Sequence, residues 1–423
     1  MNILILGGGG REHTFCWKLS QSASVKNIFI APGNAGTAKL GRNIDLNIND
    51  FAAVKKEVIK NKISMVLVGP EEPLVNGIHD FFLSDNILKK IPLIGPTKRA
   101  ARLEGSKEFA KKFMGRNSIP TAKYAVFSEK NVAAGHNFLK GLNPPYVLKA
   151  DGLAAGKGVL ILDTFEKAKE EFSNMLEGKK FGTASKKVVI EEFLKGDELS
   201  CFLLTDGESY LTLPMAKDYK RIGEGDTGLN TGGMGAISPV PFVDESFLKK
   251  IDERIIKPTM RGLAKGKIDY VGFIFIGLIK VGNSPYVIEY NVRMGDPETE
   301  VVFPRIKNDF GKILLSLADK KISKINLQIE KKSAATIFTV SGGYPESYQK
   351  GKKIIGIDKI KGSYVFHAGT LFRGQEILTN GGRVIAVTSL ADSFKEAINE
   401  SYRAIKKIRF DGLYYRKDIG FDL

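Results

Sequence analysis

The chain has 423 residues, 43% hydrophobic and 26% charged, an ordinary globular composition that argues against a disordered or fibrous protein. The formal net charge of +17 raises nucleic acid as a partner, but the basic residues come as scattered pairs without interleaved aromatic residues, so we expect a lysine-rich solvated surface and no nucleic-acid partner. Two distant cysteines, Cys16 and Cys201, argue against a disulfide framework or a structural zinc site and favour a reduced, cytoplasmic setting.

Short apolar runs alternate with segments of helical spacing over the first part of the chain. The runs are residues 2–6, 27–30, 65–68 and 91–94, and the helical segments include residues 11–20 and 51–61. Alternating strands and helices predict a parallel sheet with helices on both faces. We place this first domain at residues 1–104. The chain opens on an apolar strand without a basic segment or a cleavage site, so we expect no signal peptide.

Four glycines, Gly7, Gly8, Gly9 and Gly10, follow the first strand and precede the first helix. Glycines there let backbone N–H groups approach a phosphate at the positive end of the helix dipole, and we expect phosphate binding. A merely tight strand–helix turn is the alternative. A dinucleotide fingerprint would need glycine where Glu12 stands and an acidic residue at the end of the second strand, so the pattern argues against NAD.

A helical stretch and a glycine-rich hairpin follow the first domain. Residues 98–116 have helical character, and Ser106 is a typical N-cap, so we expect a second helix to start near Lys107. Further on, residues 151–158 are glycine-rich and lie between two short strands, whereas a P-loop leads into a helix. We expect this hairpin to close over ATP phosphates as a lid, with Lys149 reaching in from the preceding strand. An ordinary glycine hairpin is the alternative.

A hinge and a long glycine-rich stretch come next. The strand predicted at residues 187–193 runs out into a hinge whose backbone groups can read the edge of adenine, and Glu198 just beyond it can hold ribose hydroxyls. After a strand at residues 200–204, residues 222–239 are predicted to form a long loop without regular structure. Such a loop in a compact enzyme usually carries function.

A polar cluster follows the buried strand predicted at residues 285–290. Glu289 and Asn291 project from one face of that strand because they are two residues apart. Two oxygen ligands there suit a hard cation such as Mg²⁺, with ATP phosphates and water completing the octahedron. Arg293 lies on the same face by spacing and can hold a phosphoryl or carboxylate group at two points. A frayed polar strand end is the alternative.

The tail of the chain, residues 327–423, carries short strands and a helix predicted at residues 393–408. The longest apolar run, residues 270–279, falls short of the roughly 20 residues of a membrane helix, so it predicts a buried strand. The four histidines have no metal-ligand spacing.

Motifs in a fixed order run along almost the whole chain. They are Gly9-Gly10-Arg11-Glu12-His13, Pro32-Gly33-Asn34-Ala35-Gly36-Thr37, Val68-Gly69-Pro70-Glu71, Leu103-Glu104-Gly105-Ser106-Lys107, residues 149–159, Asn230-Thr231-Gly232-Gly233-Met234-Gly235-Ala236, Gly295-Asp296-Pro297-Glu298 and Arg416-Lys417-Asp418-Ile419-Gly420. In this order they resemble the ATP-grasp ligases, and more narrowly the phosphoribosylamine–glycine ligase family. The resemblance implies an α/β protein with an N-terminal Rossmann-like parallel-sheet domain (1–104), a central ATP-grasp domain of two α+β subdomains (105–326, the lid subdomain at about 122–194) and a small C-terminal α+β domain (327–423).

The resemblance also implies a reaction, the ATP-dependent ligation of glycine to 5-phosphoribosylamine in de novo purine (IMP) biosynthesis. The carboxylate of glycine attacks the γ-phosphate of ATP to give glycyl phosphate. The amine of 5-phosphoribosylamine then attacks the carbonyl, and the products are glycinamide ribonucleotide, ADP and phosphate. The implied cofactors are ATP and Mg²⁺, or Mn²⁺ in its place. We expect a cytoplasmic monomer whose partners are these small-molecule substrates, with no nucleic acid and no membrane.

Site residues are carried over from the family to matching positions of this chain. The ATP-binding residues are Lys107, Lys149, Gly156, Lys157, Gly158, Glu191, Phe193 and Glu198. The metal ligands are Glu289 and Asn291, and the catalytic residues around the reacting carboxylate are Asp218, Lys220 and Arg293. The substrate-binding residues are Gly10, Arg11, Pro32, Gly33, Asn34, Ala35, Gly36, Thr37, Glu71, Gly295, Asp296 and Pro297.

Five positions depart from the family pattern. Gly8, Tyr219, Leu229, Ile237 and Met294 stand where a polar residue, His, Pro, Tyr and Phe are usual. Most are packing positions on the substrate side. Tyr219 bears most directly on the site because it lies between two predicted catalytic residues.

Three other functions compete with this one. A purine-pathway ATP-grasp carboxylase or transformylase is opposed by residues 230–236 in combination with residues 295–298. A nicotinamide-dependent dehydrogenase is opposed by Glu12 in the glycine turn. A non-enzymatic nucleic-acid binder rests only on the net charge, and such binding would be nonspecific if moderate salt abolished it.

Overall fold

The N-terminal part of the chain forms the five-stranded parallel sheet that the alternating pattern predicts. The computed structural model describes residues 1–154, 158–178 and 180–423. The strand order is β3-β2-β1-β4-β5. The strands are β1 (Asn2–Gly7), β2 (Asn27–Pro32), β3 (Arg42–Asn43), β4 (Met65–Val68) and β5 (Leu93–Ile94), and the helices are α1 (Gly10–Leu19), α2 (Phe51–Lys60), α3 (Glu71–Asn76) and α4 (Ile78–Ser84).

Two helices lead from this sheet to the next one. They are α5 (Lys98–Gly105) and α6 (Lys107–Arg116). The predicted cap is confirmed, because the hydroxyl of Ser106 accepts a hydrogen bond from the amide of Phe109 at 3.2 Å. This cap ends one helix and starts the next, and it places Lys107 in the first turn of α6.

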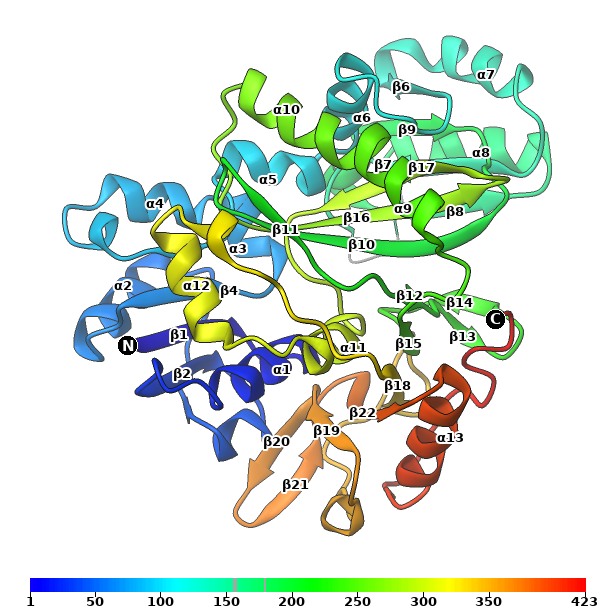
Figure 1. The fold of residues 1–423 in the computed structure, drawn as a ribbon. Coiled ribbons are helices and arrows are strands. Elements are labelled where there is room, and N and C mark those ends of the chain that lie inside the picture. The colour runs from blue at the N-terminus through cyan, green and yellow to red at the C-terminus, as the bar shows by residue number, and fades with distance from the viewer. Residues whose placement is uncertain (155–157, 179) are drawn as a thin grey trace.

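A four-stranded antiparallel sheet with two helices follows, in the upper right of Figure 1. Its strand order is β6-β9-β7-β8. The elements are β6 (Tyr124–Ser128), α7 (Val132–Lys140), β7 (Tyr146–Ala150), β8 (Val159–Leu162), α8 (Phe165–Leu176) and β9 (Lys187–Glu191). Lys149 pairs with Val159 across the predicted glycine hairpin, so the strands on its two sides are confirmed.

A second four-stranded antiparallel sheet has the order β11-β10-β16-β17. Its strands are β10 (Asp197–Thr205), β11 (Tyr210–Thr212), β16 (Gly272–Val281) and β17 (Ser284–Asn291). The helices that follow β11 and β17 in the chain are α9 (Glu245–Ile251), α10 (Lys257–Lys265), α11 (Thr299–Val302) and α12 (Phe310–Ala318), and a π-helical turn at Asp252–Ile256 joins α9 to α10. The long apolar run predicted as a buried strand is most of β16.

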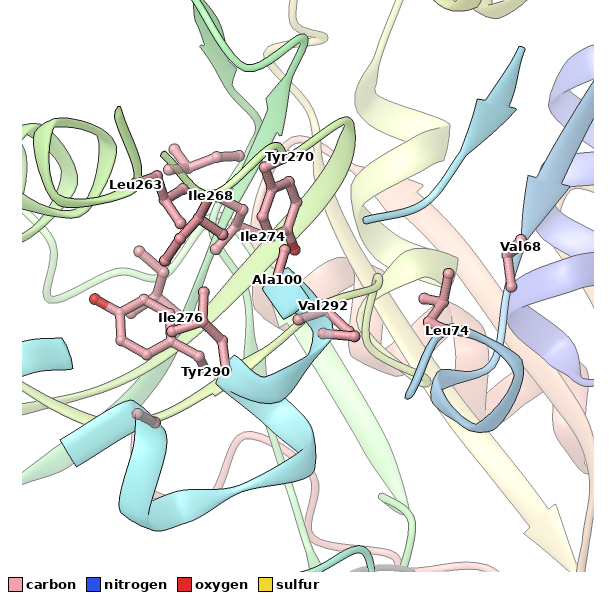
Figure 2. Close-up of a cluster of buried hydrophobic side chains, with 14 of the residues drawn as sticks. Val68, Leu74, Ala100, Leu263, Ile268, Tyr270, Ile274, Ile276, Tyr290 and Val292 are labelled. Atoms are coloured by element: carbon pink, nitrogen blue, oxygen red, sulfur yellow. The ribbon is translucent and has the colours of Figure 1, made fainter. Parts of the chain in front are cut away.

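One hydrophobic core joins this second sheet to the N-terminal sheet. Figure 2 shows Val68 and Leu74 of the first domain on one side of Ala100 of α5, and Ile276 and Tyr290 of the second sheet on the other. Tyr290 of β17 is buried in the same cluster, where its hydroxyl lies 2.6 Å from the hydroxyl of Thr259. The core therefore fixes the end of β17 relative to the N-terminal sheet.

The last sheet combines the tail with two strands from the middle of the chain. Its order is β12-β15-β18-β22-β19. Its strands are β12 (Lys217–Asp218), β15 (Gly235–Ser238), β18 (Ser333–Val340), β19 (Tyr364–His367) and β22 (Arg383–Ala391). The hairpin β20 (Thr370–Arg373) and β21 (Glu376–Thr379) is a separate two-stranded sheet, and the last helix is α13 (Phe394–Ile405).

The prediction of a loop without regular structure at residues 222–239 is wrong. The segment contains the hairpin β13 (Arg221–Gly223) and β14 (Thr227–Asn230), and then β15, which pairs with β18. Glycine content suggested a loop, but distant partners supply the hydrogen bonds that make it a sheet. No helix among the described residues is both long enough and apolar enough to span a bilayer.

Candidate functional site

The end of β17 presents the polar cluster that the sequence predicts. Tyr290 points into the core, so Glu289 and Asn291 project from the opposite face. Gly277 lies across from Glu289 in β16, and a Cβ there would stand 3.3 Å from the Glu289 side chain. Glycine at this position leaves room for the carboxylate.

Arg293 is held by two carboxylates from the N-terminal half of the chain. Its Nε donates to Glu71 at 3.2 Å and its Nη2 donates to Glu104 at 2.9 Å. The same Nη2 lies 3.3 Å from Asn291 Oδ1, and the second oxygen of Glu104 accepts from the amide of Val292 at 2.8 Å. The predicted catalytic arginine thus links the metal-side strand to α3 and α5.

These two carboxylates share one guanidinium, and their pKa values move in opposite directions. Burial raises the pKa of Glu104 to about 7, against the opposing attraction of Arg293. Burial also acts on Glu71, but Arg293 and Arg11 outweigh it, and the pKa of Glu71 lies below its usual value. Glu104 is 7% exposed and Glu71 is 30% exposed, so the cost of burying a carboxylate falls mainly on Glu104.

A buried group of lysines surrounds Glu191 at the end of β9. Lys149 and Lys111 each place their Nζ 3.0 Å from the same oxygen of Glu191, and Lys111 also donates to Thr121 at 2.7 Å. Burial lowers the pKa of Lys107, which begins the same helix face as Lys111. The other oxygen of Glu191 is buried without a partner among the described residues. Cations at this density suit the phosphates of a nucleotide.

The remaining predicted nucleotide contacts follow β9, lie in β10 or border the hairpin between β7 and β8. Phe193 follows β9 and is 41% exposed, and Glu198 begins β10. Gly158 accepts a hydrogen bond from the amide of Ala150 at 2.8 Å across the hairpin. Gly156 and Lys157, which we also expect to bind ATP, lie outside the described residues.

Asp218 and Lys220 meet Glu198 beside β10. Lys220 Nζ lies 2.6 Å from Glu198 and 3.9 Å from Asp218. Burial raises the pKa of Asp218, and burial raises the pKa of nearby Glu298 to about 7, where Asp218 adds repulsion. Glu298 accepts from the hydroxyl of Ser200 at 3.0 Å. This cluster has three acidic side chains and one lysine, so it favours an ammonium group or a metal ion over an isolated anion.

The glycine turn before α1 meets the turn that follows Arg293. The amide of Gly9 donates to Glu12 at 2.6 Å, and the amide of Arg11 donates to Asp296 at 3.2 Å. The Arg11 side chain donates to the carbonyl of Met294 at 3.1 Å. Two of the amides that the sequence offers to a phosphate therefore already have carboxylate partners.

The loop after β2 is built around Asn34. Its side-chain amide donates to the carbonyls of Gly8 at 3.0 Å and His367 at 2.7 Å, and its side-chain oxygen accepts from the amides of Gly36 and Thr37. This side chain shapes the loop. Ala35 is buried, while Pro32 at the end of β2 and Gly33 retain exposure. A Cβ on Gly8 would stand 2.7 Å from the Gly33 carbonyl oxygen, which explains glycine at that departure from the family pattern.

A divalent cation fits the end of β17 only together with ligands from outside the protein. In the described part of the chain, no three His, Cys, Asp or Glu side chains are grouped so that they could hold a metal ion. Glu289 and Asn291 supply two oxygens on one face, and the amide nitrogen of Asn291 is buried without a partner among the described residues. Mg²⁺ is commonly bound by one or two protein oxygens plus phosphates and water, and this donor set fits that pattern.

Four residues that the sequence did not assign to the site lie beside assigned ones: Glu104, Lys111, Glu298 and Arg383. Glu104 and Glu298 stand in two of the motifs that carry the family resemblance. Arg383 comes from β22 and binds Asp296 at 2.9 Å. Lys111 carries a usable signal, because it lies four residues after Lys107 and so shares its helix face. Arg383 carries none, because its partner is far away in sequence.

Family models match most of the chain. The model described as "Phosphoribosylglycinamide synthetase, N domain" matches residues 1–104, the ATP-grasp (A) domain model matches residues 105–299 and the C domain model matches residues 334–422.

Curated relatives match over the full length. A phosphoribosylamine–glycine ligase from Vibrio vulnificus is 44% identical over 427 residues, covering 100% of this chain and 98% of that protein. One from Caldanaerobacter subterraneus is 44% identical over 419 residues, covering 99% of each chain. A trifunctional purine biosynthetic protein from Gallus gallus is 42% identical over 99% of this chain, which corresponds to 42% of that protein.

Solved structures agree. The phosphoribosylamine–glycine ligase of Thermotoga maritima superposes with a TM-score of 0.86 at 34% identity, covering 99% of this chain and 100% of that one. The biotin carboxylase domain of a 2-oxoglutarate carboxylase from Hydrogenobacter thermophilus, described in complex with MgADP, has a TM-score of 0.73 at 16% identity, covering 98% and 91%. The second likeness concerns the fold alone.

Proposed function

The chain belongs to the phosphoribosylglycinamide synthetase family and is an ATP-binding phosphoribosylamine–glycine ligase of purine biosynthesis, and from that premise we propose how its residues carry out the reaction. The substrates are ATP, glycine and 5-phosphoribosylamine. The nucleotide lies along the lysine group at Lys149, Lys111 and Lys107, with adenine at the hinge near Phe193 and ribose at Glu198. One buried oxygen of Glu191 has no partner among the described residues, which supports a ligand that donates a hydrogen bond at this place.

The first step joins phosphate to glycine. A carboxylate oxygen of glycine attacks the γ-phosphorus of ATP, the bond from that phosphorus to the β–γ bridging oxygen breaks, and ADP leaves with the electron pair. Lys149 and Lys107 offset the negative charge on the phosphate oxygens, and Arg293 holds the reacting carboxylate. Asp218 offers its carboxylate to the ammonium group of glycine, and Lys220 keeps the surrounding acidic group balanced.

Mg²⁺, or Mn²⁺ in its place, would be held by Glu289 and Asn291. When bound, the ion offsets charge on the phosphate oxygens and fixes their direction. The Arg293 guanidinium contacts the oxygen of Asn291, so the protein also orients this amide before any ligand arrives.

The second step forms the amide. The amine nitrogen of 5-phosphoribosylamine attacks the carbonyl carbon of glycyl phosphate, the carbon–oxygen bond to phosphate breaks, and the amine proton leaves with the phosphate product or to water. The surface formed by Gly10, Arg11, Glu71 and Asp296 faces this substrate, together with residues 32–37 and the turn at Gly295 and Pro297. Arg293 stands between the two substrates because it contacts Glu71 on one side and Asn291 on the other.

The predicted domains bind different substrates. Residues 1–104 bind 5-phosphoribosylamine, residues 105–326 bind ATP and glycine with a lid subdomain at about 122–194, and residues 327–423 form the C-terminal domain. We also propose that the protein acts as a monomer, since the site assigned here needs no residue from a second copy.

The bridging position of Arg293 is the observation that carries this assignment. Its test is ADP release by the purified protein with Mg-ATP, with and without glycine and with 5-phosphoribosylamine generated in situ. We expect release only with both, and glycinamide ribonucleotide in equal amount. ADP release that depends on another carboxylate or amine would mean that the substrate assignment is wrong.

A further inference from the structure

The strand segment that carries Asp218 and Lys220 has a second face. Alternate residues of a strand project to opposite sides, so Lys217 and Tyr219 point away from the two predicted catalytic residues. Tyr219 is 1% exposed and packs in the hydrophobic cluster of the C-terminal sheet. The departure at Tyr219 is therefore a change behind the site rather than inside it.

Asp422, the second-to-last residue, bridges the two residues of that back face. The Tyr219 hydroxyl donates to Asp422 Oδ1 at 2.9 Å, and Lys217 Nζ lies 3.1 Å from Asp422 Oδ2. Burial and the nearby carboxylate of Asp422 raise the pKa of the Tyr219 phenol, so it remains a neutral donor. One carboxylate thus ties two alternate positions of the site strand to the end of the chain.

Residues near the same end of the chain also bind the hairpin β13–β14, which follows the strand segment of Asp218 and Lys220. Arg416 is 0% exposed and forms a two-point pair with Asp418, both contacts at 2.8 Å, while its Nη1 donates to Asp226 at 2.6 Å. Asp418 also accepts from the amide of Gly225 at 2.7 Å, and Tyr414 donates to the carbonyl of Ile222 at 3.0 Å. Asp226 and Gly225 form the tip of the hairpin β13–β14. The tail therefore holds both this tip and the strand segment that carries Lys217 and Tyr219.

We propose that residues 414–423, the C-terminal clamp, are a positioning element for the ligation: through Asp422 they set the direction in which Asp218 and Lys220 meet glycine. The inference rests on the proposed function, because it needs those two residues at the reacting carboxylate. Asp422 meets Lys217 and Tyr219 on the back face of the strand, so Asp422 and Tyr219 act through that strand and not on the substrate.

The geometry predicts which kinetic constant responds. Displacing reacting groups by about 1 Å can cost roughly 100-fold in rate even when the change lies away from the chemistry. Among the described residues, neither Glu191 nor its partners Lys149 and Lys111 forms a hydrogen bond or ion pair with Asp422. Loss of the clamp should therefore affect glycine more than the nucleotide, which shares only the contact of Lys220 with Glu198.

The test compares Asp422→Ala, Asp422→Asn and Tyr219→Phe in the full chain, with Asp411→Ala as a matched control. Asp411 is a 78% exposed tail aspartate paired with Lys352 at 2.8 Å, outside the clamp. Glycine kinetics, calorimetric ADP binding and thermal unfolding are measured for each. We expect Asp422→Ala to lower kcat/KM for glycine by about 10- to 100-fold, with a smaller loss of ADP affinity and the control unchanged.

Two further comparisons separate positioning from general damage. Asp422→Asn keeps an oxygen that can accept from Tyr219, so it should recover part of the loss. The double variant Tyr219→Phe with Asp422→Ala should be no worse than Asp422→Ala alone, because the two residues act as one unit. Unchanged glycine kinetics in Asp422→Ala, or an equal loss of ADP affinity, would overturn the proposal.

Failure of the underlying assignment is recognised separately. Asp218→Asn and Lys220→Met are measured beside the clamp variants. If these two keep full turnover, the proposed function is wrong at these positions and the clamp proposal falls with it. If they lose turnover while the clamp variants do not, only the clamp proposal is wrong.

Discussion

Glu104→Gln should remove a large part of the pH dependence of stability. Glu104 is 7% exposed, and its carboxylate shares Arg293 with Glu71, so burial holds its pKa at about 7 instead of the ordinary 4.5. A pKa raised in the folded state contributes stability that is fully present below the unfolded value and is lost as pH rises through the folded value. In the ligand-free enzyme the loss therefore falls mainly between about pH 5 and about pH 8.

The size of that loss follows from the shift. Linkage with one pKa unit equal to 1.36 kcal/mol gives a change of about 2.5 kcal/mol in the free energy of unfolding between pH 5 and pH 8. Glutamine has the shape and neutrality of the protonated acid, so the variant should lack this contribution at every pH. The free energy of unfolding of Glu104→Gln minus that of the parent protein should therefore increase by about 2.5 kcal/mol as the pH rises from 5 to 8.

The assay is urea unfolding of both proteins at several pH values, without nucleotide. Glu298 has its pKa raised into the same range by burial, so only the difference between variant and parent isolates Glu104. Glu72→Gln, at an exposed glutamate next to Glu71, is the matched control and should follow the parent. A constant difference between Glu104→Gln and the parent across this range would refute the reasoning.

Four other substitutions test the site and the fold. Glu289→Gln combined with Asn291→Ala should raise the Mg²⁺ concentration needed for half-maximal turnover and reduce turnover strongly; full activity in a Mg²⁺ titration would remove the metal assignment. Arg293→Ala should lower turnover by about 100-fold or more while ADP binding by calorimetry changes little, because the guanidinium serves the reacting carboxylate; equal losses in both would contradict that role. Arg416→Met should lower the free energy of unfolding by about 3 kcal/mol, because Asp418 loses a buried two-point partner, and an unchanged denaturant midpoint would show that the network contributes nothing.

Short-range geometry was enough to predict from sequence how part of the candidate site is arranged. The alternation of residues in β17 puts Glu289 and Asn291 on one face. The cap at Ser106 puts Lys107 at the start of a helix, and Lys149 lies in the strand that leads into the glycine hairpin. Each inference needed only the period of a strand or the chemistry of a helix end, which residues close in sequence dictate.

The tertiary structure alone decided the pairings between distant residues. Glu104 meets Arg293 across 189 positions, and Arg383 reaches the carbonyl of Asp296 across 87. No local pattern predicts such pairs, because they depend on how whole sheets pack through a common core. The sequence predicts phosphate binding at the glycine turn before α1, whereas in the structure the distant Asp296 accepts from the amide of Arg11, directly after that turn.

The error at residues 222–239 has the same cause. Glycine-rich sequence has weak intrinsic preference for a strand, so reading it alone favours a loop. In the folded chain β18 pairs with β15 and Arg416 holds the hairpin tip from 190 residues away. Local composition decides what a segment prefers in isolation, and long-range hydrogen bonds and ion pairs decide what it becomes here.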